Sequence, residues 1–249
     1  MKIYKILAGI VVVLLLICIL GLVALAQLPE ELPQTTTVPD QPALYPTEDI
    51  ELPQTPDAGQ EYIDKIYFVG DSTTYHFFKG GVDRSHLLVP PDERTLWLQS
   101  DILDIVVTED GETITDALKA ADAEIVIITL GVNGAADYTE REYKTYYKKL
   151  INAINQESPN TVIILQSIFP VTKDYSDNHR ITNAIIDKMN GWVRDIASDC
   201  GVKFLDTQTI LKDENGAQKE EYGEDDGIHM NSEAYKAILE YIRTHSIYE

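Results

Sequence analysis

The stretch Lys65-Ile66-Tyr67-Phe68-Val69-Gly70-Asp71-Ser72 is an apolar run that stops at a glycine and two polar residues. Similar apolar runs occupy residues 124–130, 161–165 and 202–205, and all of them are rich in β-branched side chains. Most are continuously apolar rather than alternating, which is typical of strands that are buried on both faces of a parallel sheet. The four runs therefore predict the central sheet of the chain.

Segments with helical periodicity separate these runs. Residues 138–155, 180–198 and 231–245 carry apolar side chains three and four positions apart, and Asn231 or Ser232 is suited to cap the last of these helices. The interval 82–123 is less regular, and we interpret residues 105–107 as a short strand and 114–121 as a helix. Alternating strands and helices predict an α/β fold with a mostly parallel sheet that is covered on both faces.

The N-terminal segment reads as a membrane helix. Residues 6–26 contain no charge, Lys2 and Lys5 precede them, and no lysine or arginine follows until Lys65. About 20 apolar residues suffice to cross a bilayer. The distribution of lysines predicts that residues 1–5 lie in the cytoplasm and that the rest lies outside.

A cleaved signal peptide is the alternative interpretation of this segment. Ala24-Leu25-Ala26 fits the small-x-small cleavage pattern, so cleavage near Ala26 would give a secreted protein. The apolar run is longer than the usual apolar region of a signal peptide, which favours the anchor. Both interpretations place the remaining chain outside the cytoplasm.

Residues 27–60 have the composition of a spacer. They hold seven of the chain's eleven prolines and seven acids, with no lysine or arginine. Such a segment buries too little apolar surface to offset the entropy of ordering it. We expect an extended linker at 27–60 and a folded domain at 61–249.

The formal net charge of −21 argues against nucleic acid and against an anionic membrane surface as partners. The sequence has no Cys-x-x-Cys, no Gly-x-Gly-x-x-Gly and no Walker A pattern. We therefore expect no cofactor and no metal site. The sequence gives no indication of oligomeric state.

Ser72 lies where the first apolar run ends and where the following residues can open a helix. Its hydroxyl would then lie near backbone N–H groups and the positive end of the helix dipole. A serine is a nucleophile only when a base accepts its proton. Taken alone, Gly-Asp-Ser-Thr is equally a turn with a capping serine.

His229 is the best base among the five histidines. Asp226 precedes it by three residues across Gly227, so the carboxylate can fold back onto Nδ1 and leave Nε2 facing the serine. Asp225 is a possible substitute for Asp226. His76 is a weaker candidate, because it lies one turn further along the helix that Ser72 would open.

Asn133 follows Gly131 and Val132 at the end of the second run, where a side-chain amide can stabilise an oxyanion. In parallel α/β sheets, ligands bind outside the carboxyl ends of the strands. Ser72 and Asn133 both fall at such ends, which favours a common site.

Gly70-Asp71-Ser72, Gly131-Val132-Asn133 and the pair Asp226 and His229 resemble the first, third and last sequence blocks of the SGNH (GDSL-type) hydrolase superfamily. The resemblance covers residues 61–249 and implies a three-layer α/β/α sandwich, flavodoxin-like in its layers, that hydrolyses esters or acyl-sugars. It implies Ser72 as nucleophile, His229 as base and Asp226 as its orienting carboxylate. The Ser72 N–H and the Asn133 side chain would hold the oxyanion.

Two departures from that pattern stand out. The second block supplies a glycine N–H to the oxyanion, yet Gly80, Gly81 and Gly111 have no suitable context. We place this donor at Thr95 or a neighbour of it. The third block usually reads Gly-x-Asn-Asp, whereas residue 134 is glycine.

These observations predict a membrane-tethered, extracytoplasmic serine esterase that acts on acetyl or other acyl esters of carbohydrates, or on other small esters. Two alternatives stay open: an acyltransferase that delivers the acyl group to a sugar hydroxyl, and a degenerate scaffold that binds a glycan or protein without turnover.

Overall fold

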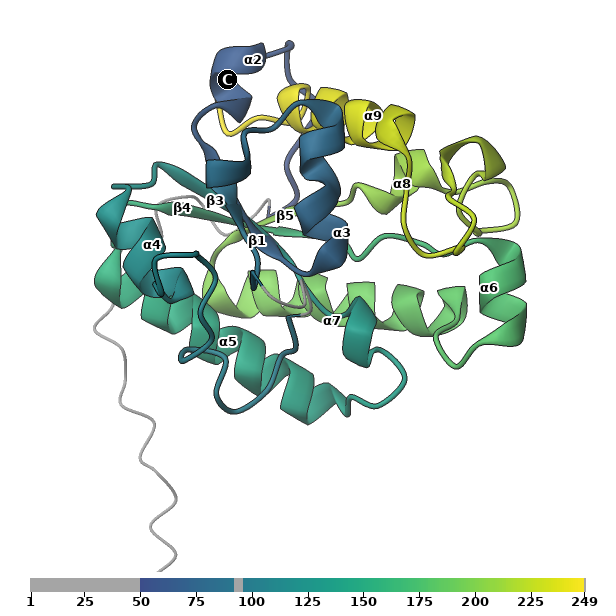
Figure 1. Cartoon of the computed structure of the whole chain (residues 1–249), viewed down its shortest axis with the longest axis horizontal. Helices are drawn as coiled ribbons and strands as arrows, with labels where there is room; N and C mark the ends of the chain where they lie inside the picture. Colours follow the sequence, from purple (N-terminus) through teal and green to yellow (C-terminus); the bar gives the residue numbers. More distant parts are fainter. Residues whose placement is uncertain (1–49, 92–95, 249) are drawn as a thin grey trace, which may run out of the picture. The chain divides into compact units, whose positions relative to one another are not determined.

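A computed structural model describes residues 50–91 and 96–248 of the chain (Figure 1). Within these residues, one sheet has the strand order β2-β1-β3-β4-β5, and every pair of neighbouring strands is parallel. The predicted α/β class with a mostly parallel sheet is confirmed. The strands are β1 (Ile66–Gly70), β2 (Leu87–Leu88), β3 (Ile125–Thr129), β4 (Val162–Gln166) and β5 (Lys203–Leu205).

The three long helices predicted from periodicity are present as α5, α7 and α9. The α-helices are α2 (Gln60–Ile63), α3 (Ser72–Tyr75), α4 (Ile114–Ala120), α5 (Glu140–Glu157), α6 (Lys173–Asn178), α7 (Asn183–Cys200), α8 (Gln208–Leu211) and α9 (Ser232–Arg243). Single 3-10 turns are η1 (His76–Gly80), η2 (Arg84–His86), η3 (Val132–Gly134) and η4 (Glu220–Tyr222). Asn231 caps α9 as expected, since its side chain accepts from the N–H groups of Glu233 and Ala234.

Helices cover both faces of the sheet, as Figure 1 shows with α9 on one side and α5 and α7 on the other. Alternate residues of β3 divide between two apolar cores. Val126 and Ile128 pack into the core beneath α5 and α7, whereas Ile125 and Ile127 pack into the core beneath α9. Because both faces are buried, the strand reads as one continuous apolar run.

The prediction of a strand at 105–107 is wrong. Val106 forms only an isolated antiparallel bridge with Thr113, and its side chain is 41% exposed. Val107 alone of the three is buried, so the run anchors a loop instead of adding to the sheet. Leu87–Leu88, which lacks the length of a strand signal in the sequence, pairs with β1 instead.

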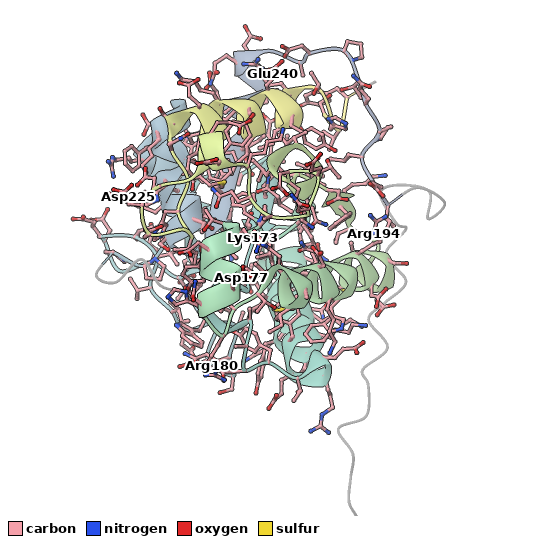
Figure 2. The ribbon with its side chains drawn as sticks, turned by 90° about the vertical axis from the view of Figure 1, so that its right-hand side faces the viewer. Lys173, Asp177, Arg180, Arg194, Asp225 and Glu240 are labelled. Atoms are coloured by element: carbon pink, nitrogen blue, oxygen red, sulfur yellow. The ribbon has the colours of Figure 1, made fainter. Side chains whose placement is uncertain are left out.

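Residues 50–60, which the sequence assigns to the linker, pack on the domain. The N–H of Leu52 donates to the carbonyl of Phe204 at 3.0 Å, and the Phe204 N–H donates to the carbonyl of Ile50 at 2.8 Å. Glu51 pairs with Arg194, which Figure 2 labels. The exposed edge of β5 offers unpaired backbone groups, and this segment satisfies them. The folded part therefore starts at or before residue 50.

Residues 1–49 lie outside the described residues, and with them the predicted cytoplasmic tail at 1–5, the predicted membrane segment at 6–26 and most of the linker. Among the residues that the structure does describe, no helix is long and apolar enough to cross a membrane.

Candidate active site

Ser72 is the first residue of α3 and is separated from the end of β1 by Asp71 alone. Asp71 caps this helix, and its Oδ1 accepts from the N–H of Thr73 at 3.0 Å and from the Thr73 hydroxyl at 2.8 Å. The turn requires glycine at position 70, because a Cβ there would lie 1.9 Å from Thr74 Oγ1 and 2.6 Å from the carbonyl oxygen of Thr129. The strand, the glycine and the cap together place the serine at the carboxyl edge of the sheet.

Three side chains predicted from the sequence form one hydrogen-bonded chain. His229 Nδ1 lies 2.6 Å from Asp226 Oδ2, and His229 Nε2 lies 2.9 Å from Ser72 Oγ. An ionised carboxylate only accepts, so Nδ1 carries the proton, and Nε2 is left to accept from the serine hydroxyl. Such an arrangement can remove a proton from the serine as its oxygen attacks an electrophile.

The loop that carries Asp226 and His229 is shaped by the carboxylate itself. Asp226 Oδ1 accepts from the backbone N–H of Ile228 at 3.0 Å and of His229 at 2.8 Å. Gly227 has a φ of 74°, and a Cβ there would lie 2.6 Å from Thr172 Oγ1. Partial burial raises the pKa of Asp226, but the hydrogen bonds from the His229 ring and backbone outweigh it and lower that pKa overall.

Asp225, which Figure 2 labels, is exposed on the same loop. The carboxylate bonded to His229 is that of Asp226, so the structure favours Asp226 over Asp225 as its partner. His76 packs edge-on against the His229 ring, with 4.9 Å between ring centroids. The histidine that is hydrogen-bonded to Ser72 is His229.

Lys79 of η1 contacts the loop that carries Asp226 and His229 at two points. Its ammonium donates to the carbonyl oxygen of Met230 at 3.1 Å and pairs with the carboxylate of Glu224. The two partners flank Asp226 and His229, so one side chain holds both ends of the loop. Lys79 was not predictable from the sequence, because a lysine in a Phe-Lys-Gly-Gly segment carries no local sign of a contact roughly 150 residues away.

Asn133 lies in η3, which follows β3 at the same edge of the sheet as Ser72, since β3 pairs with β1 and Gly70 is opposite Thr129. Its Nδ2 is buried and meets no acceptor among the described residues. Gly131 has a φ of 133°, and a Cβ there would lie 2.8 Å from the Tyr143 hydroxyl. A buried amide donor without an acceptor is costly, and an oxyanion would satisfy it.

The region of the predicted second-block donor is only partly described. Thr95 lies outside the described residues. Among the glycines considered for this role, Gly80 packs against α9, where a Cβ would lie 2.7 Å from Leu239 Cδ1. The segment that begins at residue 96 contacts the turn after η3, since the N–H of Leu98 donates to the Tyr138 hydroxyl at 2.8 Å. The Tyr138 ring in turn lies against Gly134, where a Cβ would come within 2.3 Å of it.

Asp71 is a fully buried carboxyl group next to Ser72 in the chain, at 1% exposure. Burial raises its pKa to about 6, although the bonds from Thr73 and the proximity of His229 act in the opposite direction. Within the described residues, no cluster of histidine, cysteine and acidic side chains is suited to a metal ion.

A serine at the carboxyl edge of a parallel sheet, bonded to a histidine that a carboxylate orients, is the arrangement that serine hydrolases use. The sequence agrees with this class. Residues 68–237 match the GDSL-like lipase/acylhydrolase family, and the chain belongs to that family. It is accordingly a carboxylic ester hydrolase of the SGNH type.

Two solved structures with TM-scores above 0.5 have the same fold. A GDSL-like lipase from Bacteroides thetaiotaomicron is 17% identical, with a TM-score of 0.52 over 73% of this chain and 87% of that one. A protein from Streptococcus pneumonia, described as a candidate platelet activating factor, is 23% identical, with a TM-score of 0.51 over 71% of this chain and 81% of that one. A family two carbohydrate esterase from Clostridium thermocellum is 14% identical, with a TM-score of 0.49 over 72% and 61%. No curated protein sequence matches the chain.

Proposed function

We propose that this hydrolase is a membrane-tethered, extracytoplasmic serine esterase that removes acetyl or other acyl groups from carbohydrates or other small esters. Ser72 is the nucleophile, His229 the base and Asp226 its orienting carboxylate. The observation that carries the proposal is the continuous hydrogen-bonded chain from Asp226 through His229 to Ser72. The apolar segment at 6–26 and the lysines before it support the location.

The geometry supports a two-step reaction. His229 Nε2 accepts the proton of Ser72 while Oγ attacks the ester carbonyl, and the imidazolium is stabilised by Asp226. His229 then donates that proton to the leaving alcohol, which leaves an acyl-serine. Water repeats the sequence in reverse, releasing the acid and restoring the serine. A sugar hydroxyl in place of water would give acyl transfer from the same intermediate.

Two donors support the oxyanion that forms in each step. The N–H of Ser72 lies at the start of α3, and the buried Nδ2 of Asn133 has no acceptor within the described residues. Each such donor is worth about 3 kcal/mol of transition-state stabilisation. We therefore expect Asn133 to contribute to the rate through the oxyanion.

The test compares hydrolysis of p-nitrophenyl acetate by the full chain and by Ser72→Ala, with Ser198→Ala on the exposed surface of α7 as the matched control. We expect activity in the wild type and the control and none in Ser72→Ala. Equal rates in wild type and Ser72→Ala would exclude this nucleophile. A wild type that neither turns over nor reacts with a fluorophosphonate probe would indicate the degenerate scaffold instead.

The location is tested on intact cells. We expect an added protease to digest the domain without lysis, because the proposal places it outside the membrane. Protection of the domain until the cells are lysed would refute the outward orientation.

A further inference from the structure

A cavity of about 350 Å³ runs along the edge strand β2 beside Tyr75 of α3. Its walls come from α3, from η2, from β2 itself, from the residues that leave β2 and from the loop at 107–109. Pockets that enclose small ligands measure about 300–1,000 Å³. An acetyl group would leave most of this cavity empty, whereas a sugar ring would fill much of it.

One wall of the cavity lies about one helical turn from Ser72, which does not itself line the cavity. Tyr75 lines it, and Tyr75 follows Ser72 by three residues in α3, so both side chains project from the same face of that turn. Leu88 of β2 pairs with Val69 of β1, and therefore Pro90 and Ser72 leave the sheet at the same edge. An ester held at Ser72 can thus extend its alcohol part into the cavity.

Arg84 places a positive charge on one part of the cavity wall, and the carboxylate of Glu109 lies on another part of it. Its guanidinium carbon lies 3.8 Å from the Phe78 ring centroid and 4.9 Å from that of Tyr75, and it donates to the Tyr75 hydroxyl. None of the described carboxylates is within ion-pair distance of it, and the neighbouring Asp83 is engaged with the N–H and hydroxyl of Ser85. The aromatic rings hold the guanidinium in place, and within residues 50–91 and 96–248 no carboxylate neutralises it in an ion pair.

We infer that this cavity binds the sugar part of the ester and that the sugar carries a carboxylate, which pairs with Arg84. The inference rests on the proposed function, because it names the substrate class of the same site. The Tyr75 ring offers an apolar surface to the sugar ring, and the carboxylate of Glu109 in the loop at 107–109 can accept from its hydroxyls. A guanidinium binds a carboxylate through two parallel hydrogen bonds, which discriminates an acidic sugar from its neutral counterpart.

The experiment compares two substrates that differ only in this group, the mono-O-acetyl esters of methyl glucuronoside and of methyl glucoside, with the full chain. We expect wild type to prefer the acidic ester by at least about tenfold in kcat/KM, which is the value of one charge-assisted pair. Arg84→Gln is expected to abolish that preference, and Arg84→Lys to retain part of it. Arg141→Gln, an exposed arginine of α5, is the matched control and should keep the wild-type ratio.

A ratio that Arg84→Gln leaves within twofold of wild type would overturn the inference, as would a wild type without preference. A binding measurement separates this failure from that of the proposed function. Methyl glucuronoside and methyl glucoside are titrated by NMR into Ser72→Ala, with and without Arg84→Gln. Selective, Arg84-dependent binding of the glucuronoside supports the inference even where no ester is hydrolysed, and equal binding of both sugars refutes it.

Discussion

Replacing Asp226 by asparagine tests the orienting role of this residue with little change in shape. In the wild type, Oδ2 faces His229 Nδ1 at 2.6 Å while Oδ1 accepts two backbone N–H groups, of Ile228 and His229. An asparagine that keeps Oδ1 on the backbone must turn its NH₂ toward Nδ1. The ring then accepts at Nδ1 and carries its proton on Nε2, where it cannot accept from Ser72.

The size of the effect follows from these contacts. Flipping the amide to restore the productive tautomer would sacrifice two backbone hydrogen bonds, at about 1 kcal/mol each. The unproductive tautomer is thus favoured by about 2 kcal/mol, or roughly 30-fold. Loss of the carboxylate charge beside the imidazolium adds to this, and the equivalent change in a well-studied serine protease lowers kcat about 10⁴-fold. We expect kcat of Asp226→Asn to fall between roughly 30-fold and 10⁴-fold, with little change in KM.

The assay is steady-state hydrolysis of p-nitrophenyl acetate together with the thermal midpoint of unfolding. Asp226→Asn should keep the wild-type midpoint because the loop keeps its backbone bonds, whereas Asp226→Ala should lower it. Asp225→Asn, at the exposed neighbouring position, is the matched control and should leave kcat unchanged. Retention of more than a third of the wild-type kcat in Asp226→Asn would refute the reasoning, and loss confined to Asp225→Asn would transfer the role to that residue.

Three further substitutions test other parts of the site. Because burial raises the pKa of Asp71 to about 6, the wild type loses stability as this carboxyl ionises from about pH 4 to pH 6. Urea titrations give the free energy of unfolding of Asp71→Asn and of wild type at pH 4 and pH 8. The value for Asp71→Asn minus that for wild type should be about 2 kcal/mol higher at pH 8 than at pH 4. An unchanged difference would contradict the burial argument. Lys79→Met should lower kcat about tenfold at near-constant KM through loss of its two contacts, with partial rescue by Lys79→Arg. Its control, Lys119→Met at an exposed ion pair, should match wild type, and equal effects of the two would exclude a positioning role. Gly134→Ala should cost about 1–3 kcal/mol of unfolding free energy, because its Cβ meets the Tyr138 ring, and additivity with Tyr138→Ala would exclude that clash.

The central strands were predictable because burial on both faces imposes a continuous apolar run, as in β3. Residues 87–88 and 105–107 show the limit of this signal. Both are short apolar groups, but only Leu87 and Leu88 find a partner strand, and that pairing depends on where η2 directs the chain. Runs of two or three residues do not carry enough periodicity to distinguish a strand from a loop anchor.

The candidate site was predictable where its chemistry is local in sequence. Asp226 reaches His229 across one glycine, and Ser72 follows directly from its strand, so spacing alone indicates both. Lys79 acts on a loop far along the chain, and Arg84 matters because Phe78 and Tyr75 fold beneath it. Contacts of this kind are decided by packing, which no short motif encodes.

Glycine at position 134, where the family pattern has an aspartate, has a physical cause in this chain. The Tyr138 ring occupies the space that any side chain at 134 would need, and its hydroxyl accepts the N–H of Leu98. Tyr138 therefore joins the turn that carries Asn133 to the segment that follows residues 92–95, where the second oxyanion donor is predicted. A larger residue at 134 would displace the ring and release that segment. Gly134 departs from the family pattern because it packs against Tyr138. The departure therefore gives no support to the degenerate-scaffold alternative.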